Sequence, residues 1–132
     1  MRLKNAQTFY NSIDMSAYAT SEGDRAAARE ALGVAPDQFV VVGNGQVQPR
    51  KRVDVLAEYA RANPDVRVFW VGGITFKKLG ANYTEMTELI DTSPENMTVT
   101  GVIDISEVKE YYQAADVFVL PSEQENHPMC VL

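Results

Sequence analysis

Short runs of β-branched and aromatic residues alternate along the chain with longer amphipathic stretches. The runs cover residues 39–42, 66–71, 97–100 and 117–120. Three of them are almost continuously apolar, a composition typical of strands that are covered on both faces of a sheet. The pattern therefore predicts four short strands in the interior of the protein.

The stretches around these runs predict helices. Apolar residues recur at positions i, i+3, i+4 and i+7 over residues 53–60 and again over 108–115, which gives each helix one apolar face. Ser106 is the expected N-cap of the second of these helices. A third helix is expected over 83–90. An alanine-rich helix over 21–33 begins with a Ser-x-x-Asp capping box and ends at a glycine.

The alternation of strands and helices indicates strand–helix–strand units with right-handed crossovers. Such units build a parallel sheet covered by helices on both faces, so the expected fold class is α/β, a Rossmann-like three-layer sandwich. In sheets of this kind, ligands bind outside the carboxyl ends of the strands. Candidate chemistry is therefore expected in the segments that directly follow each strand.

Composition and charge narrow the class of protein. The chain has 132 residues, of which 45% are hydrophobic, and this fits one globular domain. A net charge of −6 argues against nucleic-acid binding, which needs a surplus of cations. A single cysteine, Cys130, and the lack of an apolar run near the ~20 residues that span a bilayer predict a cytoplasmic protein. One histidine and no Asp-x-Asp pair predict no metal ion, and no cofactor is expected.

The segment after the first strand predicts a diphosphate site. It reads Gly43-Asn-Gly45 and leads into Arg50 and Lys51. Glycines let the backbone approach a ligand closely, and a helix N-terminus beside two cations favours an anion. Gln48 stands where a dinucleotide-binding fingerprint has its third glycine, which weakens an NAD interpretation. A tight turn without a ligand, followed by a solvated helix start, explains the same residues.

Glycine-rich or polar segments also follow the other three strands. Gly72-Gly73 follows the second strand and residues 101–104 follow the third. The segment after the fourth strand, 121–128, is the most polar in the chain, and side chains of its kind accept hydrogen bonds from sugar hydroxyls: Glu123, Glu125, Asn126 and His127. Each segment alone also has ordinary loop composition, and a lone histidine is commonly a structural hydrogen-bonding group.

Five motifs along the chain together resemble one family of enzymes. They are Val42-Gly-Asn-Gly45 with Pro49-Arg-Lys-Arg-Val-Asp-Val-Leu56, then Phe69-Trp-Val-Gly-Gly73, Val99-Thr-Gly101, the run Tyr111-Tyr-Gln-Ala-Ala-Asp-Val-Phe-Val-Leu-Pro-Ser122, and Glu125-Asn-His-Pro-Met-Cys-Val-Leu132. Their order and spacing resemble the C-terminal, donor-binding domain of retaining glycosyltransferases of family 4. These enzymes have two Rossmann-like domains, an arrangement called the GT-B fold. Within the family, the motifs look most like those of bacterial diacylglycerol glucosyltransferases.

The resemblance also implies how the chain is organised. Residues 11–14 resemble the family's interdomain Asn-Gly-Val-Asp segment. Residues 1–36 are therefore expected to be an interdomain segment and the leading helix of the donor domain. Residues 37–132 are expected to be the nucleotide-sugar-binding domain, incomplete at its C-terminus. The missing partner is then an N-terminal acceptor domain, through which any peripheral contact with a membrane would run.

The resemblance further implies roles for individual residues. Lys51 would bind the donor diphosphate and Glu125 the donor sugar, and these two are the expected catalytic residues. The backbone of Val102 and Ile103 would meet the nucleobase, and the loop 126–129 would offer N–H groups to the sugar and phosphate. The complete expected donor site is Gly43, Gly45, Gln46, Arg50, Lys51, Gly73, Val102, Ile103, Glu125, Asn126, His127, Pro128 and Met129.

Two positions depart from the family pattern. Gln46 stands where the family usually has an arginine, so one charge at the diphosphate is lost unless Arg50 or Arg52 supplies it. The family's second glutamate would fall one residue beyond Leu132, and Pro128 is expected to open the helix that carries it. We therefore expect a chain that is inactive alone and that self-associates through exposed apolar surface.

The expected function is transfer of a hexose, with glucose as the first candidate, from a UDP sugar to an acceptor such as a diacylglycerol lipid at the inner face of the membrane. A non-catalytic nucleotide-sugar-binding module predicts the same fold without a need for Glu125. A sugar-nucleotide epimerase typically has Gly-His-Arg-Glu-Asn, which Glu125-Asn-His127 resembles without matching. A receiver-like domain would need an acidic cluster where the chain has Gly43-Asn-Gly45.

Overall fold

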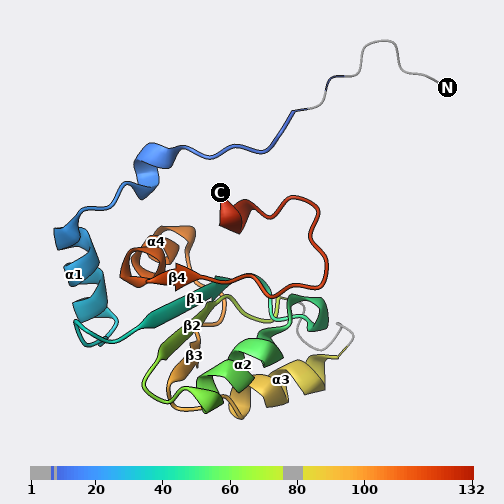
Figure 1. Ribbon diagram of the computed structural model, residues 1–132. Coiled ribbons are helices and arrows are strands. Elements are labelled where there is room, and N and C mark those ends of the chain that lie inside the picture. Colours follow the sequence, from blue (N-terminus) through green and yellow to red (C-terminus); the bar gives the residue numbers. More distant parts are fainter. Residues whose placement is uncertain (1–6, 8, 76–81) are drawn as a thin grey trace.

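Four short parallel strands form one sheet in the order β3-β2-β1-β4 (Figure 1). The computed structural model describes residues 7, 9–75 and 82–132. The strands are β1 (Val40–Asn44), β2 (Arg67–Val71), β3 (Met97–Val99) and β4 (Val117–Phe118). The α-helices are α1 (Glu22–Ala31), α2 (Val53–Ala62), α3 (Tyr83–Asp91) and α4 (Ile105–Ala114). Single 3-10 turns are η1 (Met15–Tyr18), η2 (Pro49–Lys51) and η3 (Met129–Val131).

The helices cover both faces of this sheet, with α2 and α3 on one face and α1 and α4 on the other (Figure 1). Successive residues of a strand point to opposite faces. Val41 and Trp70 therefore pack into the core under α2, whereas Val42 and Phe69 pack into the core under α4. All four side chains are at most 2% exposed. The predicted Rossmann-like three-layer sandwich is confirmed.

Helix starts follow local hydrogen bonding. The predicted capping box of α1 is present, because Asp24 N donates to Ser21 Oγ (3.1 Å) and Ser21 N donates to Asp24 Oδ2 (2.8 Å). The predicted N-cap of α4 is wrong by two residues. Asp104 caps this helix: its Oδ1 accepts from Ser106 N (2.9 Å), and Glu107 Oε2 accepts from Asp104 N (3.0 Å). In the Asp-x-x-Glu spacing each of the two side chains accepts a backbone N–H of the first turn. A cap at Ser106 would have Lys109 three residues later, and a lysine side chain cannot accept a hydrogen bond.

Strand ends differ from the apolar runs that predicted them. β1 continues through Asn44, two residues past its apolar run. β4 stops at Phe118 instead of Leu120, and the last bond to β1 runs from Val119 N to Val42 O (2.8 Å). β1 then continues alongside β2 alone.

Among the helices that the structure describes, none combines the length and the apolar character needed to span a membrane.

Candidate functional site

The glycine loops at the carboxyl ends of β1 and β2 pack directly on each other. Gly45 N donates to Val71 O (3.0 Å), and Gly72 N donates to Thr100 Oγ1 (3.0 Å). Gly45 and Gly72 have φ angles of 145° and 137°. A Cβ atom at Gly72 would lie 2.0 Å from Gly45 O, so no other residue fits there. The two loops therefore form one rigid rim above the sheet.

Two of the glycines expected to approach a ligand instead approach protein groups. Gly43 is buried in β1, where a Cβ atom would lie 2.7 Å from the ring of Trp70. A Cβ atom at Gly73 would lie 2.8 Å from Gly101 Cα. The missing side chain at Gly43 makes room for the indole, and the one at Gly73 lets the loops after β2 and β3 touch.

Lys51 is the buried cation of this rim, with 9% of its surface exposed. Its Cε and Nζ atoms lie 3.4 and 3.6 Å from the position that a Cβ of Gly45 would take. The ammonium donates to Glu125 Oε1 (2.5 Å). The backbone N–H groups of Lys51 and Arg52 are already hydrogen-bonded, whereas those of a helix N-terminus are free. Both donate within the turn of η2, and Lys51 N donates to Gln48 O (2.9 Å). Arg52 then takes the left-handed conformation (φ 53°, ψ 44°) and redirects the chain into α2.

The loop after β4 is held against η2 by several contacts besides this ion pair. Glu123 N donates to Arg50 O (2.9 Å), and Arg50 Nη1 donates to Gln124 O (3.2 Å). Arg52 Nη1 donates to Glu123 Oε1 (3.4 Å). Glu123 thus pairs with Arg52 and not with Lys51. All three consecutive basic residues of the chain contact this loop, and these contacts bring residues 74 positions apart into one site.

The Glu125 carboxylate is held ionised by its neighbours. The hydrogen bond from Lys51 lowers the pKa of Glu125 most, the Ser122 hydroxyl lowers it further, and burial acts in the opposite direction. Ser122 Oγ is buried and reaches full hydrogen-bond geometry with no group that the structure describes. Ser122 Oγ is thus a close neighbour of the carboxylate and not its bonded partner. Sequence reasoning missed Ser122, because one serine in a polar loop carries no signal.

Gln46 leaves the expected diphosphate site without the positive charge of the family's arginine, and one nearby arginine is placed to supply it. The Gln46 side chain is exposed and accepts a hydrogen bond from Gln48 Nε2. The guanidinium of Arg52 is bound by Asp54 (2.9 Å) as well as by the loop after β4. Arg50 Nη1 lies 3.9 Å from the second carboxylate oxygen of Glu125. Of the two arginines, Arg50 is therefore the one beside the buried ion pair.

An open hollow of about 290 Å³ lies beside the glycine rim, at the carboxyl ends of β1 and β2. Val102, from the segment after β3, is 73% exposed at its edge. The hollow brings together expected donor-site residues that follow three different strands: Gly45, Gln46, Gly73, Val102 and Ile103. A parallel sheet predicts this convergence, because its strands all end at the same edge.

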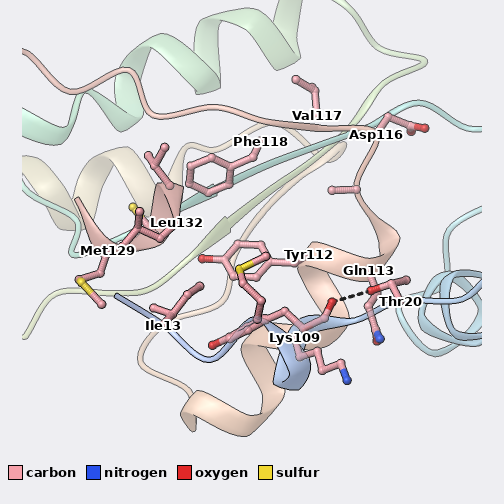
Figure 2. Close-up of a pocket in the computed structure, with 15 residues that line it drawn as sticks. Ile13, Thr20, Lys109, Tyr112, Gln113, Asp116, Val117, Phe118, Met129 and Leu132 are labelled. Carbon is pink, nitrogen blue, oxygen red and sulfur yellow. Dashed lines mark hydrogen bonds between the residues drawn. The ribbon is translucent and has the colours of Figure 1, made fainter. Parts of the chain in front are cut away.

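The expected residues 126–129 lead away from the rim toward a second hollow. Asn126 and His127 are exposed, and the ring centroid of His127 lies 6.3 Å from that of Tyr10. Pro128 does not open a helix but precedes one: it is the N-cap of η3, which begins at Met129. Met129 lines a hollow of about 350 Å³ between residues 13–20, α4, β4 and η3 (Figure 2).

This second hollow was not predicted as a site, although its apolar C-terminal wall was expected to be exposed. Tyr112 and Phe118 line it from α4 and β4 (Figure 2). Burial first, then the neighbouring Cys130 and Tyr18, raises the pKa of Tyr112 to about 12. Burial also raises the pKa of the Cys130 thiol. Both groups are therefore uncharged at physiological pH, and the hollow is mostly apolar, with Lys109, Gln113 and Asp116 also in its lining.

Comparison with known proteins gives one family. Residues 36–132 match the family described as Glycosyl transferases group 1. The alpha-galactosylglucosyldiacylglycerol synthase of Streptococcus pneumoniae is 36% identical over 104 residues, which are 79% of this chain and 28% of that protein. The processive diacylglycerol alpha-glucosyltransferase of Acholeplasma laidlawii is 31% identical over 122 residues, 92% of this chain and 36% of that protein. The chain thus spans about a third of the length of these relatives.

Solved structures share the same arrangement of strands and helices. Anabaena Alr3699/HepE in complex with UDP and glucose superposes with a TM-score of 0.69 at 26% identity, over 86% of this chain and 30% of that one. Its complex with UDP-glucose gives the same TM-score and identity over 86% and 31%. Sucrose-phosphate synthase from Thermosynechococcus elongatus gives a TM-score of 0.71 at 24% identity, over 89% and 29%, and supports the fold alone.

Proposed function

The chain belongs to the family of group 1 glycosyl transferases, and from this premise we propose that it is the donor-binding part of an enzyme that transfers a hexose from a nucleotide sugar. The observation that carries the proposal is the buried Lys51–Glu125 pair beside the Gly45 loop. One cation and one carboxylate, groups suited to a diphosphate and to sugar hydroxyls, thereby lie beside the carboxyl ends of the parallel strands, where folds of this kind bind ligands. Arg50 adds a second cation at this edge.

Each part of the site has a proposed role toward the donor. Lys51 binds the diphosphate and stabilises the charge that grows on the leaving nucleotide, an electrostatic role for which a buried, positioned ammonium is suited. Glu125 accepts hydrogen bonds from hexose hydroxyls. The backbone of Val102 and Ile103 meets the nucleobase in the 290 Å³ hollow. The backbone N–H groups of Asn126, His127 and Met129 meet the sugar and phosphate.

The proposed donor is UDP-glucose. This choice is supported by the structural neighbour, whose complexes contain UDP, glucose and UDP-glucose. The proposed acceptor is a diacylglycerol lipid, which is supported by the names of two relatives. Because these relatives are about three times as long as the chain, we propose that an acceptor domain outside it completes the enzyme at the membrane surface and that the 132 residues alone do not catalyse transfer.

Isothermal titration of UDP-glucose, UDP, ADP and NAD into the 132-residue chain tests the donor role. We expect uridine nucleotides to bind more tightly than ADP or NAD. Lys51→Ala should weaken UDP binding roughly tenfold to a hundredfold, because it removes a charge-assisted bond worth about 1.5–3 kcal/mol. Arg61→Ala removes an equal charge from the exposed face of α2 and should change nothing.

Two results would count against the proposal. A folded chain, verified by circular dichroism, that binds none of the four nucleotides would exclude the donor role. Equal weakening of UDP binding by Lys51→Ala and Arg61→Ala would show that only net charge matters and that Lys51 is not at the site.

A further inference from the structure

Lys51 and Glu125, which are proposed to bind the diphosphate and the hexose of the donor, form an ion pair with each other in the structure. Lys51 Nζ and Glu125 Oε1 are 2.5 Å apart, and the side chains are only 11% and 20% exposed. A diphosphate and a carboxylate are both anions, and either can bind the Lys51 ammonium. Because the Lys51–Glu125 pair is largely shielded from water, salt screens it weakly. A bound diphosphate would therefore compete directly with Glu125 for Lys51.

We propose that Glu125 is an internal counter-ion of Lys51 that the donor diphosphate displaces, so that Glu125 is released to the hexose only after the diphosphate has taken the lysine. This inference rests on the proposed donor role. It makes Glu125 a residue that lowers affinity for the nucleotide and supplies preference for the sugar. The site would then favour a ligand that carries both a diphosphate and a hexose over either part alone.

The exchange does not require the loop after β4 to move. Its backbone is tied to η2 by Glu123 N to Arg50 O (2.9 Å) and by Arg50 Nη1 to Gln124 O (3.2 Å). A further tie is the bond from Arg52 to Glu123 (3.4 Å). None of these contacts uses the Glu125 side chain. The carboxylate can therefore change partners while its Cα position is held.

Neither member of the pair has to move far in the exchange. Lys51 Nζ lies 3.6 Å from the position that a Cβ of Gly45 would take, so the ammonium is already beside the glycine rim where the diphosphate is proposed to lie. For Glu125, the buried hydroxyl of Ser122 is a neighbour without a complete hydrogen bond of its own. A hydroxyl can donate to a carboxylate that has lost its ammonium. Ser122 thus offers Glu125 a partner after the exchange.

Titration of UDP and UDP-glucose into the chain and into Glu125→Gln tests the exchange. We expect Glu125→Gln to bind UDP about three- to tenfold more tightly, because Lys51 no longer has a competing anion. The preference for UDP-glucose over UDP should shrink in the same variant. Glu58→Gln is the matched control: it removes the same charge from the exposed face of α2, so both affinities should stay within about twofold.

A second measurement uses the unaltered chain, so it does not depend on the folding of a variant. The pKa of Glu125, followed by the ¹³C shift of its carboxyl carbon, should rise when UDP is bound, because the carboxylate has lost Lys51. If the carboxyl keeps its low pKa with UDP bound, or if folded Glu125→Gln binds UDP no more tightly than the unaltered chain, the exchange is wrong while the donor role stands. If the unaltered chain binds no UDP, the donor role fails first.

Discussion

At the residue scale, Gly72 is the position where the backbone leaves least room. A Cβ atom there would lie 2.0 Å from Gly45 O, at a φ of 137° that side chains rarely adopt. Gly72→Ala should destabilise the chain by about 3 kcal/mol or more, because both the clash and the strain act on one rigid rim. Chemical denaturation followed by circular dichroism measures this change in the free energy of unfolding.

Gly23→Ala is the matched control, since it is the same substitution in α1, where the nearest atom to a new Cβ is Ser21 Oγ at 3.7 Å. Alanine inside a helix should stabilise the chain by about 0.5–1 kcal/mol. Equal effects of the two substitutions would contradict the close packing of the two loops.

Sequence reasoning could find these residues but not the reason for them. A glycine in a turn looks the same whether the group that approaches it is a ligand or another part of the chain. The indole against Gly43 and the carbonyl against Gly72 come from segments that are adjacent in space and separated in sequence. The Lys51–Glu125 pair likewise joins positions 74 residues apart. The strand pattern put both segments at the carboxyl ends of the strands, but it did not predict that the two side chains pair.

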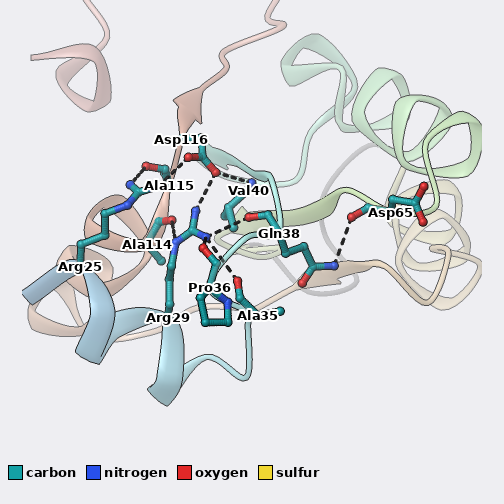
Figure 3. A network of polar contacts seen from close by, with 10 residues as sticks. All are labelled: Arg25, Arg29, Ala35, Pro36, Gln38, Val40, Asp65, Ala114, Ala115 and Asp116. Carbon is teal, nitrogen blue, oxygen red and sulfur yellow. Dashed lines mark hydrogen bonds and ion pairs between the residues drawn. The ribbon is translucent and has the colours of Figure 1, made fainter. Parts of the chain in front are cut away.

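At the scale of elements, a buried arginine joins α1 to the start of β1 and β4 (Figure 3). Arg29 donates to the carbonyls of Ala114 (3.1 Å), Pro36 (2.9 Å) and Gln38 (2.9 Å), and its Nη2 pairs with Asp116 Oδ2 (2.7 Å). The same carboxylate oxygen accepts from the backbone N–H of β1 at Val40 (2.7 Å). Asp116 therefore links α1, β1 and β4 at the amino ends of these strands, away from the proposed site at their carboxyl ends.

The contribution of Asp116 to stability should depend on pH. Burial raises the pKa of Asp116, but the bond from Val40 N–H and the charges of Arg29 and Arg25 outweigh it, and the net pKa is lowered below 3.8. A carboxyl whose pKa is lowered by folding stabilises the fold fully above its unfolded pKa, and loses this effect as pH falls through its folded pKa. Asp116→Asn should cost about 2 kcal/mol at pH 7 and progressively less below about pH 4.

Urea denaturation of both chains between pH 7 and pH 3 measures this difference. Asp91→Asn, at the exposed end of α3, is the control and should change stability by less than about 0.5 kcal/mol at every pH. A constant difference between Asp116→Asn and the parent chain over this range would show that the carboxylate charge is not what links the elements.

The hydrophobic pattern predicted the positions of the helices and strands, but not the hydrogen-bond partners of their polar side chains. Periodicity located α2, α3 and α4, because one apolar face follows directly from sequence spacing, and a capping box before an alanine-rich run located α1. Arg29 reads as a solvent-facing residue of an alanine-rich helix, yet it is 6% exposed. Apart from the Asp116 carboxylate, its partners are backbone carbonyl groups, which every residue has, so no sequence signal marks them.

At the scale of the whole molecule, the parallel sheet and the meeting of the segments that follow its strands could be predicted from the sequence, whereas the second hollow could not. Alternating strands and helices permit few topologies, so the order of layers was predictable. The hollow depends on how the segment 13–20, α4, β4 and η3 meet around Tyr112, which no local pattern specifies (Figure 2). Sequence alone therefore predicted exposed apolar surface that includes part of the fourth strand, but not the hollow that this surface lines.

Self-association should occur through this surface. In the described sheet β4 is an edge strand of two residues, and apolar side chains beside it remain exposed: Val117 38%, Val131 58% and Leu132 44%. Unpaired edges next to apolar surface favour association, so sedimentation velocity between about 10 and 300 µM should show a rising weight-average mass. Val117→Lys should reduce it, because a charged edge resists pairing. Val55→Lys, at a valine equally exposed (38%) on α2, should not, and a monomer throughout would contradict association through β4.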